Sequence, residues 1–135
     1  MACIFCDIVK KKKPGHFVYE DNTHIAVLDI FPSVAGHVMV IPKRHGETIL
    51  DYTEKELGQI MEVIKKVTKG LTKTYNTDMF TIGINHAEKL GVTHLHIHIL
   101  PRFDNDSGGI IQTIVKKPVD KDLKTIAENI KKNIN

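Results

Sequence analysis

Short apolar segments separated by turn-forming residues predict a set of β-strands. The polar segment 20–23 separates apolar-rich stretches at 17–19 and 24–28, which predicts a hairpin. Three further strand candidates lie at 37–41, which stops at Pro42, at 79–84, and at 93–100, which Pro101 closes. The chain therefore contains about five candidate strands.

Two segments have helical periodicity. Thr53 and Glu56 match a capping box, which predicts that a helix begins there. Apolar residues then recur at spacings of three and four, giving one buried stripe: Leu57, Ile60, Met61, Ile64, Val67 and Leu71. A terminal helix is predicted from Asp120, with these residues facing inward: Leu123, Ile126, Ala127, Ile130 and Ile134. Strands, a long helix, more strands and a last helix predict an α+β fold with a mainly antiparallel sheet.

The composition is that of an ordinary globular protein. The 135 residues fit a single domain, 1–135, and are 41% hydrophobic and 26% charged. The net charge of +3 is too small and too dispersed to indicate a nucleic-acid partner, and the run Lys10–Lys13 is interpreted as a solvated turn. We expect no membrane partner and a cytoplasmic location, because the sequence contains neither a secretory signal nor a long apolar run.

The segment 93–100 places histidines at alternate positions, His94, His96 and His98. Alternate side chains of a strand share a face, so the three imidazoles are predicted to line one side, while the intervening apolar residues enter a core. Three interpretations are open: metal binding, nucleophilic and acid–base chemistry at phosphorus, or a polar strand face without function. Three histidines in a straight row fit poorly around one metal ion.

The histidine row and several other motifs resemble the histidine triad nucleotide-binding family. The signature His-x-His-x-His is matched at 94–100, with Asn85 before it and Pro101-Arg102 after it. The segments 3–9, 27–32 and 36–45 are similar to the family's N-terminal segment, ribose-binding strand and following strand. The resemblance implies the family's fold, a purine nucleotide substrate and a homodimer.

The resemblance also assigns catalytic roles. His96 is expected to attack the α-phosphorus and form a covalent nucleotidyl-imidazole, which water then hydrolyses. His98 is expected to contact the phosphate and assist the leaving group, and His37 to lie behind the nucleophile in a polar relay. The implied substrates are nucleoside phosphoramidates, adenylates or dinucleoside polyphosphates.

The resemblance implies a nucleotide site built from several segments. Asp29 is expected to accept hydrogen bonds from the ribose hydroxyls. An apolar slot for the base is expected from Phe5, Ile8, Val27 and Ile30. Phosphate contacts are expected from Asn85, Gly91, Thr93, His96 and His98.

The pair Cys3 and Cys6 has the two-residue spacing of a zinc-binding knuckle, and the sequence contains no second cysteine pair. A reduced buried pair and a redox pair are the alternatives. The resemblance to one branch of the family selects Cys3, Cys6, His45 and His94 as zinc ligands. Such a closed Cys2His2 set would be structural.

The segment 85–94 departs from the family pattern, since it is about two residues short and contains no glutamine. Two rival functions therefore stay open beside the hydrolase. One is a nucleotide-binding regulatory module with little turnover, and the other is a metal-dependent hydrolase that uses the histidine row as ligands.

Overall fold

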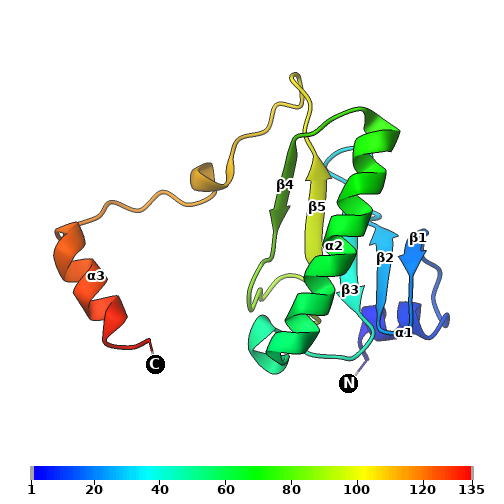
Figure 1. Ribbon diagram of the computed structural model, residues 1–135, viewed down its shortest axis with the longest axis horizontal. Coiled ribbons are helices and arrows are strands. Elements are labelled where there is room, and N and C mark those ends of the chain that lie inside the picture. Colours follow the sequence, from blue (N-terminus) through cyan, green and yellow to red (C-terminus); the bar gives the residue numbers. More distant parts are fainter. Residues whose placement is uncertain (1, 135) are drawn as a thin grey trace.

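The computed structural model describes residues 2–134 and contains a five-stranded antiparallel sheet (Figure 1). The strands are β1 (Phe17–Glu20), β2 (His24–Leu28), β3 (Val38–Pro42), β4 (Phe80–Gly83) and β5 (Ile97–Pro101), in the order β1-β2-β3-β5-β4. The predicted α+β class and the hairpin are confirmed. The third strand begins and ends one residue later than predicted, because Pro42 still pairs with His24.

Helix α2 (Glu54–Tyr75) covers one face of the sheet (Figure 1). Its predicted capping box is confirmed, since the Thr53 hydroxyl accepts from the Glu56 N–H and the Glu56 carboxylate accepts from the Thr53 N–H. The buried stripe packs on strand residues of the sheet and includes Ile60, Val63, Ile64, Val67 and Leu71. Met61 was wrongly predicted to be buried; it is 61% exposed, because the core face passes through Val63 instead.

The short helix α1 (Ile4–Val9) supports a second core on the opposite face of the sheet. Phe5 is buried there against side chains of β2 and β3. This helix was not predicted, because six residues give too few turns for a recognisable period. No helix within residues 2–134 is both long and apolar enough to cross a membrane.

The C-terminal segment leaves the sheet after β5 and extends away from it (Figure 1). It contains a short 3-10 helix, η2 (Ile111–Thr113), and the helix α3 (Leu123–Lys131), which Asp122 caps. The prediction that the apolar side of this helix faces inward is wrong. Leu123 and Ile130 are 77% and 56% exposed, because α3 does not pack on its own sheet.

Candidate functional site

The histidine segment lies at the entry to β5 rather than entirely within it. The ladder begins at Ile97, so the predicted strand from Thr93 starts too early. Before it, the Leu95 N–H donates to the Gly46 carbonyl at 2.7 Å instead of to a neighbouring strand. The predicted alternation is confirmed, because Leu95, Ile97 and Ile99 all enter the core beneath α2.

The sequence pattern suggested that the histidines lie on an uncovered polar face of the strand. They are covered instead. His94 is 1% exposed and His96 is 7% exposed, because α1 covers this side of the sheet. The Phe5 ring packs edge-on against His96, with ring centroids 5.0 Å apart. The imidazoles are therefore held in a second, partly apolar core.

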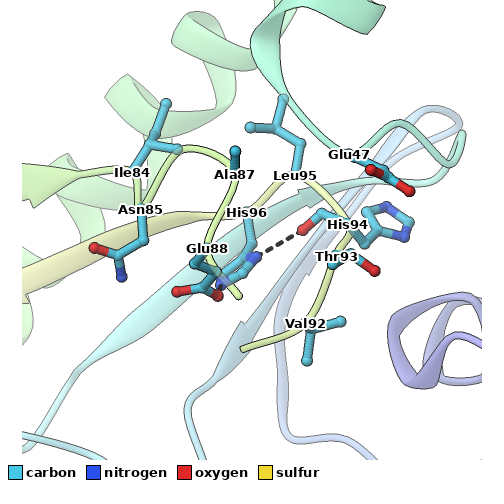
Figure 2. A pocket seen from close by; sticks show the side chains of 10 residues that line it. All are labelled: Glu47, Ile84, Asn85, Ala87, Glu88, Val92, Thr93, His94, Leu95 and His96. Atoms are coloured by element: carbon cyan, nitrogen blue, oxygen red, sulfur yellow. Dashed lines mark hydrogen bonds and ion pairs between the residues drawn. The ribbon is translucent and has the colours of Figure 1, made fainter. Parts of the chain in front are cut away.

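The backbone fixes the tautomer of His96. Its Nδ1 lies 2.7 Å from the carbonyl oxygen of His94 (Figure 2). A carbonyl only accepts, so Nδ1 carries the proton and donates it. The Nε2 atom of neutral His96 therefore has a free lone pair, which is the requirement for a nitrogen nucleophile.

His98 receives the opposite orientation through His37. The Ser33 N–H donates to Nδ1 of His37 at 3.1 Å, so neutral His37 carries its proton on Nε2. That Nε2 lies 2.8 Å from Nδ1 of His98 and donates to it. His98 therefore carries its own proton on Nε2. His96 offers a lone pair, whereas its neighbour offers a proton.

The predicted place of His37 needs correction. The expected position behind the nucleophile is taken by the His94 carbonyl, and His37 instead lies behind His98. Burial lowers the pKa of His37 below its ordinary value of 6.5, against the opposing charge of Asp29. Burial, followed by the neighbouring His96 and His37, lowers the pKa of His98 as well.

A cavity of about 580 Å³ opens beside His96 and His98, a volume in the usual range for small-molecule sites. All four residues expected to form the base slot line it: Phe5, Ile8, Val27 and Ile30. The sequence interpretation missed Ile4, Pro14, Leu28, Phe31 and Met39, which also line it. Most of them belong to α1, β2 and the turn after β2. They share no sequence motif, and only the fold brings them together at the cavity.

Asp29 lies in this cavity at the end of β2. One carboxylate oxygen, Oδ1, accepts from the Phe31 N–H at 2.9 Å and so holds the turn. The other, Oδ2, lies 3.5 Å from Nε2 of His37. The carboxylate thus has a fixed position, with one oxygen on the side of the histidines.

The loop between β4 and β5 forms the wall beside His96. Asn85 and Gly91 line the cavity as expected. Thr93 does not, since its side chain points away from His96 (Figure 2). Glu88, which the sequence interpretation did not assign, lies with Oε1 3.5 Å from Nε2 of His96. Ala87, in the same loop, has a φ of 54°, a left-handed conformation that costs an L-residue about 1 kcal/mol.

The four predicted metal ligands come together from three parts of the chain. Cys3 and Cys6 flank the start of α1, His45 follows β3, and His94 precedes β5. The Sγ–Nδ1 separations are 3.4, 3.5 and 3.6 Å, and the two Nδ1 atoms lie 3.2 Å apart. Tetrahedral zinc with ordinary bond lengths requires about 3.5 Å between sulfur and nitrogen ligands and about 3.3 Å between two nitrogens. The donor set therefore fits a tetrahedral ion.

The surroundings of the cluster also suit a metal. Nε2 of His94 lies 2.8 Å from the Pro42 carbonyl and donates to it, which leaves Nδ1 free to bind. Burial, followed by the hydrogen bond to Cys3, raises the pKa of the Cys6 thiol above 9.0. A divalent cation would reverse this shift by stabilising both thiolates. The wholly antiparallel sheet lacks the βαβ unit expected around a redox pair.

A second group of possible ligands, Asp29, His37 and His98, does not suit a metal. Binding through Nε2 of His37 would require a lone pair there and a proton on Nδ1. That proton would face the Ser33 N–H, which already donates to Nδ1. A hydrogen-bonded relay explains these contacts without an ion.

A family model described as the HIT domain matches residues 10–105, more than half of the chain. The chain belongs to the HIT family. A relative from Saccharomyces cerevisiae, named adenosine 5'-monophosphoramidase, is 37% identical over 111 residues, which is 82% of this chain and 68% of the relative.

Two solved HIT-family structures extend the comparison. A HIT-family protein from Bacillus subtilis matches with a TM-score of 0.84 and 31% identity, over 100% of this chain and 99% of that one. A zinc-bound histidine triad protein from Mycobacterium smegmatis matches with a TM-score of 0.74 and 31% identity, over 79% of each chain. The family thus includes a protein that is named as a nucleotide phosphoramidase.

Proposed function

We propose that this HIT protein hydrolyses purine nucleoside 5'-phosphoramidates and related α-phosphorus substrates through a nucleotidyl-His96 intermediate. The observation that carries the proposal is the pair of hydrogen bonds from which opposed tautomers follow for the neutral rings, a lone pair on His96 Nε2 beside a proton on His98 Nε2. Their rings are adjacent, with centroids 4.9 Å apart. One group is thus ready to attack and its neighbour is ready to donate.

In the first step, Nε2 of His96 forms a bond to phosphorus as the bond from phosphorus to the leaving nitrogen breaks. His98 gives its Nε2 proton to the departing amine, and His37, which donates its Nε2–H to Nδ1 of His98, stabilises the imidazolate that this leaves until water returns the proton. His96 then carries the positive charge as a nucleotidyl-imidazolium. The His94 carbonyl accepts from its Nδ1–H and stabilises that charge.

In the second step, water attacks the same phosphorus and loses a proton to Nε2 of His98. The bond to His96 breaks, and the imidazole leaves as a neutral group. The nucleoside monophosphate is released, and both histidines return to their starting states. Two displacements on one phosphorus replace a single slow one.

The cavity provides the remaining contacts for the nucleotide. We assign the apolar side chains of α1 and β2 to the base and Asp29 to the ribose hydroxyls. Oδ2 of Asp29 faces the interior, whereas Oδ1 is held by the turn. Asn85 and the Gly91 backbone are assigned to the phosphate end beside His96.

Single-turnover labelling tests the proposal. The protein is mixed with a limiting amount of adenosine 5'-phosphoramidate and quenched within milliseconds. Intact-mass analysis is expected to show one added adenylyl group, and peptide mapping should place it on His96. Hydrolysis without any labelled protein at all quench times would contradict the covalent path.

A nucleotide-binding module with little turnover is the second candidate, because Glu88 places a carboxylate beside the nucleophile. Measurable binding of adenosine monophosphate, combined with neither labelling nor hydrolysis, would favour it. The metal-dependent rival, with the histidine row as ligands, is disfavoured because the row is divided between two groups of possible ligands: His94 belongs with Cys3, Cys6 and His45, and His98 with Asp29 and His37.

We further propose that Cys3, Cys6, His45 and His94 bind one structural zinc ion. Support comes from the tetrahedral spacing of the donor atoms and from the zinc-bound relative. All four positions would be filled by protein, so the ion would have no open site for a substrate or water. Its role would be to fasten α1, which carries Phe5, to the segment that carries the catalytic histidines.

We propose that the chain forms a homodimer in which the C-terminal segment of each copy packs on the other. Support comes from its exposed apolar residues: Ile110, Ile111, Ile114, Val115, Val119, Leu123 and Ile130. An isolated chain rarely leaves so much apolar surface in water.

Truncation after Gly109 is expected to convert a dimer into a monomer in light scattering. Gly109 is kept because its carbonyl accepts from Arg102 at 2.6 Å. Ile130→Lys is expected to weaken the dimer at least tenfold, whereas Lys124→Gln on the same helix leaves it unchanged. A monomeric mass for the full chain would refute the proposed dimer.

A further inference from the structure

The loop that walls the active site places a negative charge beside the proposed nucleophile. Glu88 Oε1 lies 3.5 Å from His96 Nε2, and the Glu88 side chain is only 24% exposed. A Cβ built on Gly91 would collide with this carboxylate, so Glu88 lies directly against the Gly91 backbone. Gly91 therefore provides space for an anionic group of the protein itself, at the place where a phosphate contact was expected.

The charges around the cavity are unusual for a site that handles polyphosphates. Of the described residues that line it, Asp29 and Glu88 bring carboxylates, and Lys13 is the single lysine or arginine. Sites for chains of phosphates ordinarily place several cationic groups around them. Here a departing diphosphate would meet the Glu88 carboxylate. The side chains that the loop between β4 and β5 contributes to the cavity lining include no cationic group.

We propose that Glu88 is a specificity-determining residue, which selects substrates by the charge of the leaving group. It favours leaving groups that carry an ammonium group and opposes those that carry an anion. The inference rests on the proposed function, since the leaving group is defined by attack of His96 on the α-phosphorus. To admit the phosphate, the flexible Glu88 side chain rotates away from Nε2 and remains within reach of the group attached to phosphorus.

Electrostatics sets the size of the effect. Two unit charges about 6 Å apart, at an effective dielectric constant of about 40 for a partly exposed pair, change a rate or affinity by about tenfold. The Glu88 charge raises the rate or affinity for a cationic leaving group and lowers it for an anionic one. A purely structural role of Glu88 would change all substrates by the same factor.

The test uses three adenosine 5'-phosphoramidates of matched length, made from ethylenediamine, propylamine and β-alanine. They differ at the far end of the leaving group, which is cationic, neutral or anionic. We compare kcat/KM for the wild-type protein and Glu88→Gln. Dividing the two values for each substrate cancels the intrinsic reactivity of its amine.

In Glu88→Gln, kcat/KM is expected to fall about tenfold for the cationic substrate and to rise about tenfold for the anionic one. The neutral substrate is expected to change by less than about twofold, which also shows that the loop remains intact. Raising NaCl from about 0.05 M to about 0.5 M should shrink the difference. Glu62→Gln, which removes the same charge from the exposed side of α2, is the matched control.

Equal change of all three substrates, or no change in any, would overturn the role of Glu88 while leaving the proposed function intact. If no substrate is hydrolysed, the proposed function fails, and Glu88 is then tested by calorimetric binding of the same three compounds. An affinity order of cation, neutral, anion that Glu88→Gln abolishes supports the inference. Affinities that Glu88→Gln leaves in the same order refute it.

Discussion

His96→Ala is expected to lower kcat/KM for an adenosine 5'-phosphoramidate by at least about a thousandfold, because loss of a nucleophile removes the covalent path. Binding of adenosine monophosphate should change only a few-fold, since the apolar slot and Asp29 lie elsewhere in the cavity. Steady-state kinetics and calorimetry measure the two effects separately. His16→Ala, at an exposed histidine outside the cavity lining, is the control.

A comparison of leaving groups separates His96 from His98. An alkylamine needs a proton to depart, whereas a nitrophenolate leaves readily as an anion. His98→Ala should therefore cost about a hundredfold or more with the alkylamine substrate and far less with a nitrophenyl ester of adenosine monophosphate. His96→Ala should lose activity with both. Equal losses in His98→Ala would contradict its role as the proton donor.

The strands and the long helix were predictable because each depends on local pattern. The hairpin follows from turn residues between apolar segments, and α2 follows from one capping box and one apolar period. The start of β5 was not predictable. The Leu95 N–H donates a hydrogen bond to the carbonyl of Gly46, a residue 49 positions away, and no local sequence pattern predicts that partner.

The terminal helix shows a different limit. Its apolar period correctly predicts a helix, since Asp122 caps it and apolar residues recur along it. Periodicity identifies an apolar face but does not identify what covers it. The face was assigned to the protein's own core, whereas Leu123 and Ile130 are exposed.

Within the site, residue types were predictable but several pairings were not. The alternation of histidines predicted the shared side of His96 and His98, and their rings are indeed adjacent. The tautomer of His37 depends on the Ser33 N–H, and Glu88 directly follows Ala87, whose backbone adopts a positive φ. Both are properties of loop backbone, which composition and spacing do not encode.

Removal of the metal is expected to have the largest effect on stability. Purified protein should contain about one equivalent of zinc per chain, and Cys6→Ser should contain almost none. Loss of the ion frees α1 and leaves His94 buried without its partner. We expect the melting temperature to fall by about 10–20 °C, which for a chain of this size corresponds to a few kcal/mol.

A structural zinc ion would affect catalysis only through the position of α1, and this distinguishes it from a catalytic ion. A chelator should lower the melting temperature and the activity together, because Phe5 contacts His96 and moves with α1. Partial loss of zinc at a temperature where the protein stays folded should raise KM more than it lowers kcat, since the base slot is disturbed before the histidines are. A catalytic ion would instead remove kcat in the folded protein and restore it on addition of metal. Less than about a tenth of an equivalent of zinc in protein never exposed to chelator would refute the zinc site, since a closed Cys2His2 site holds its ion tightly.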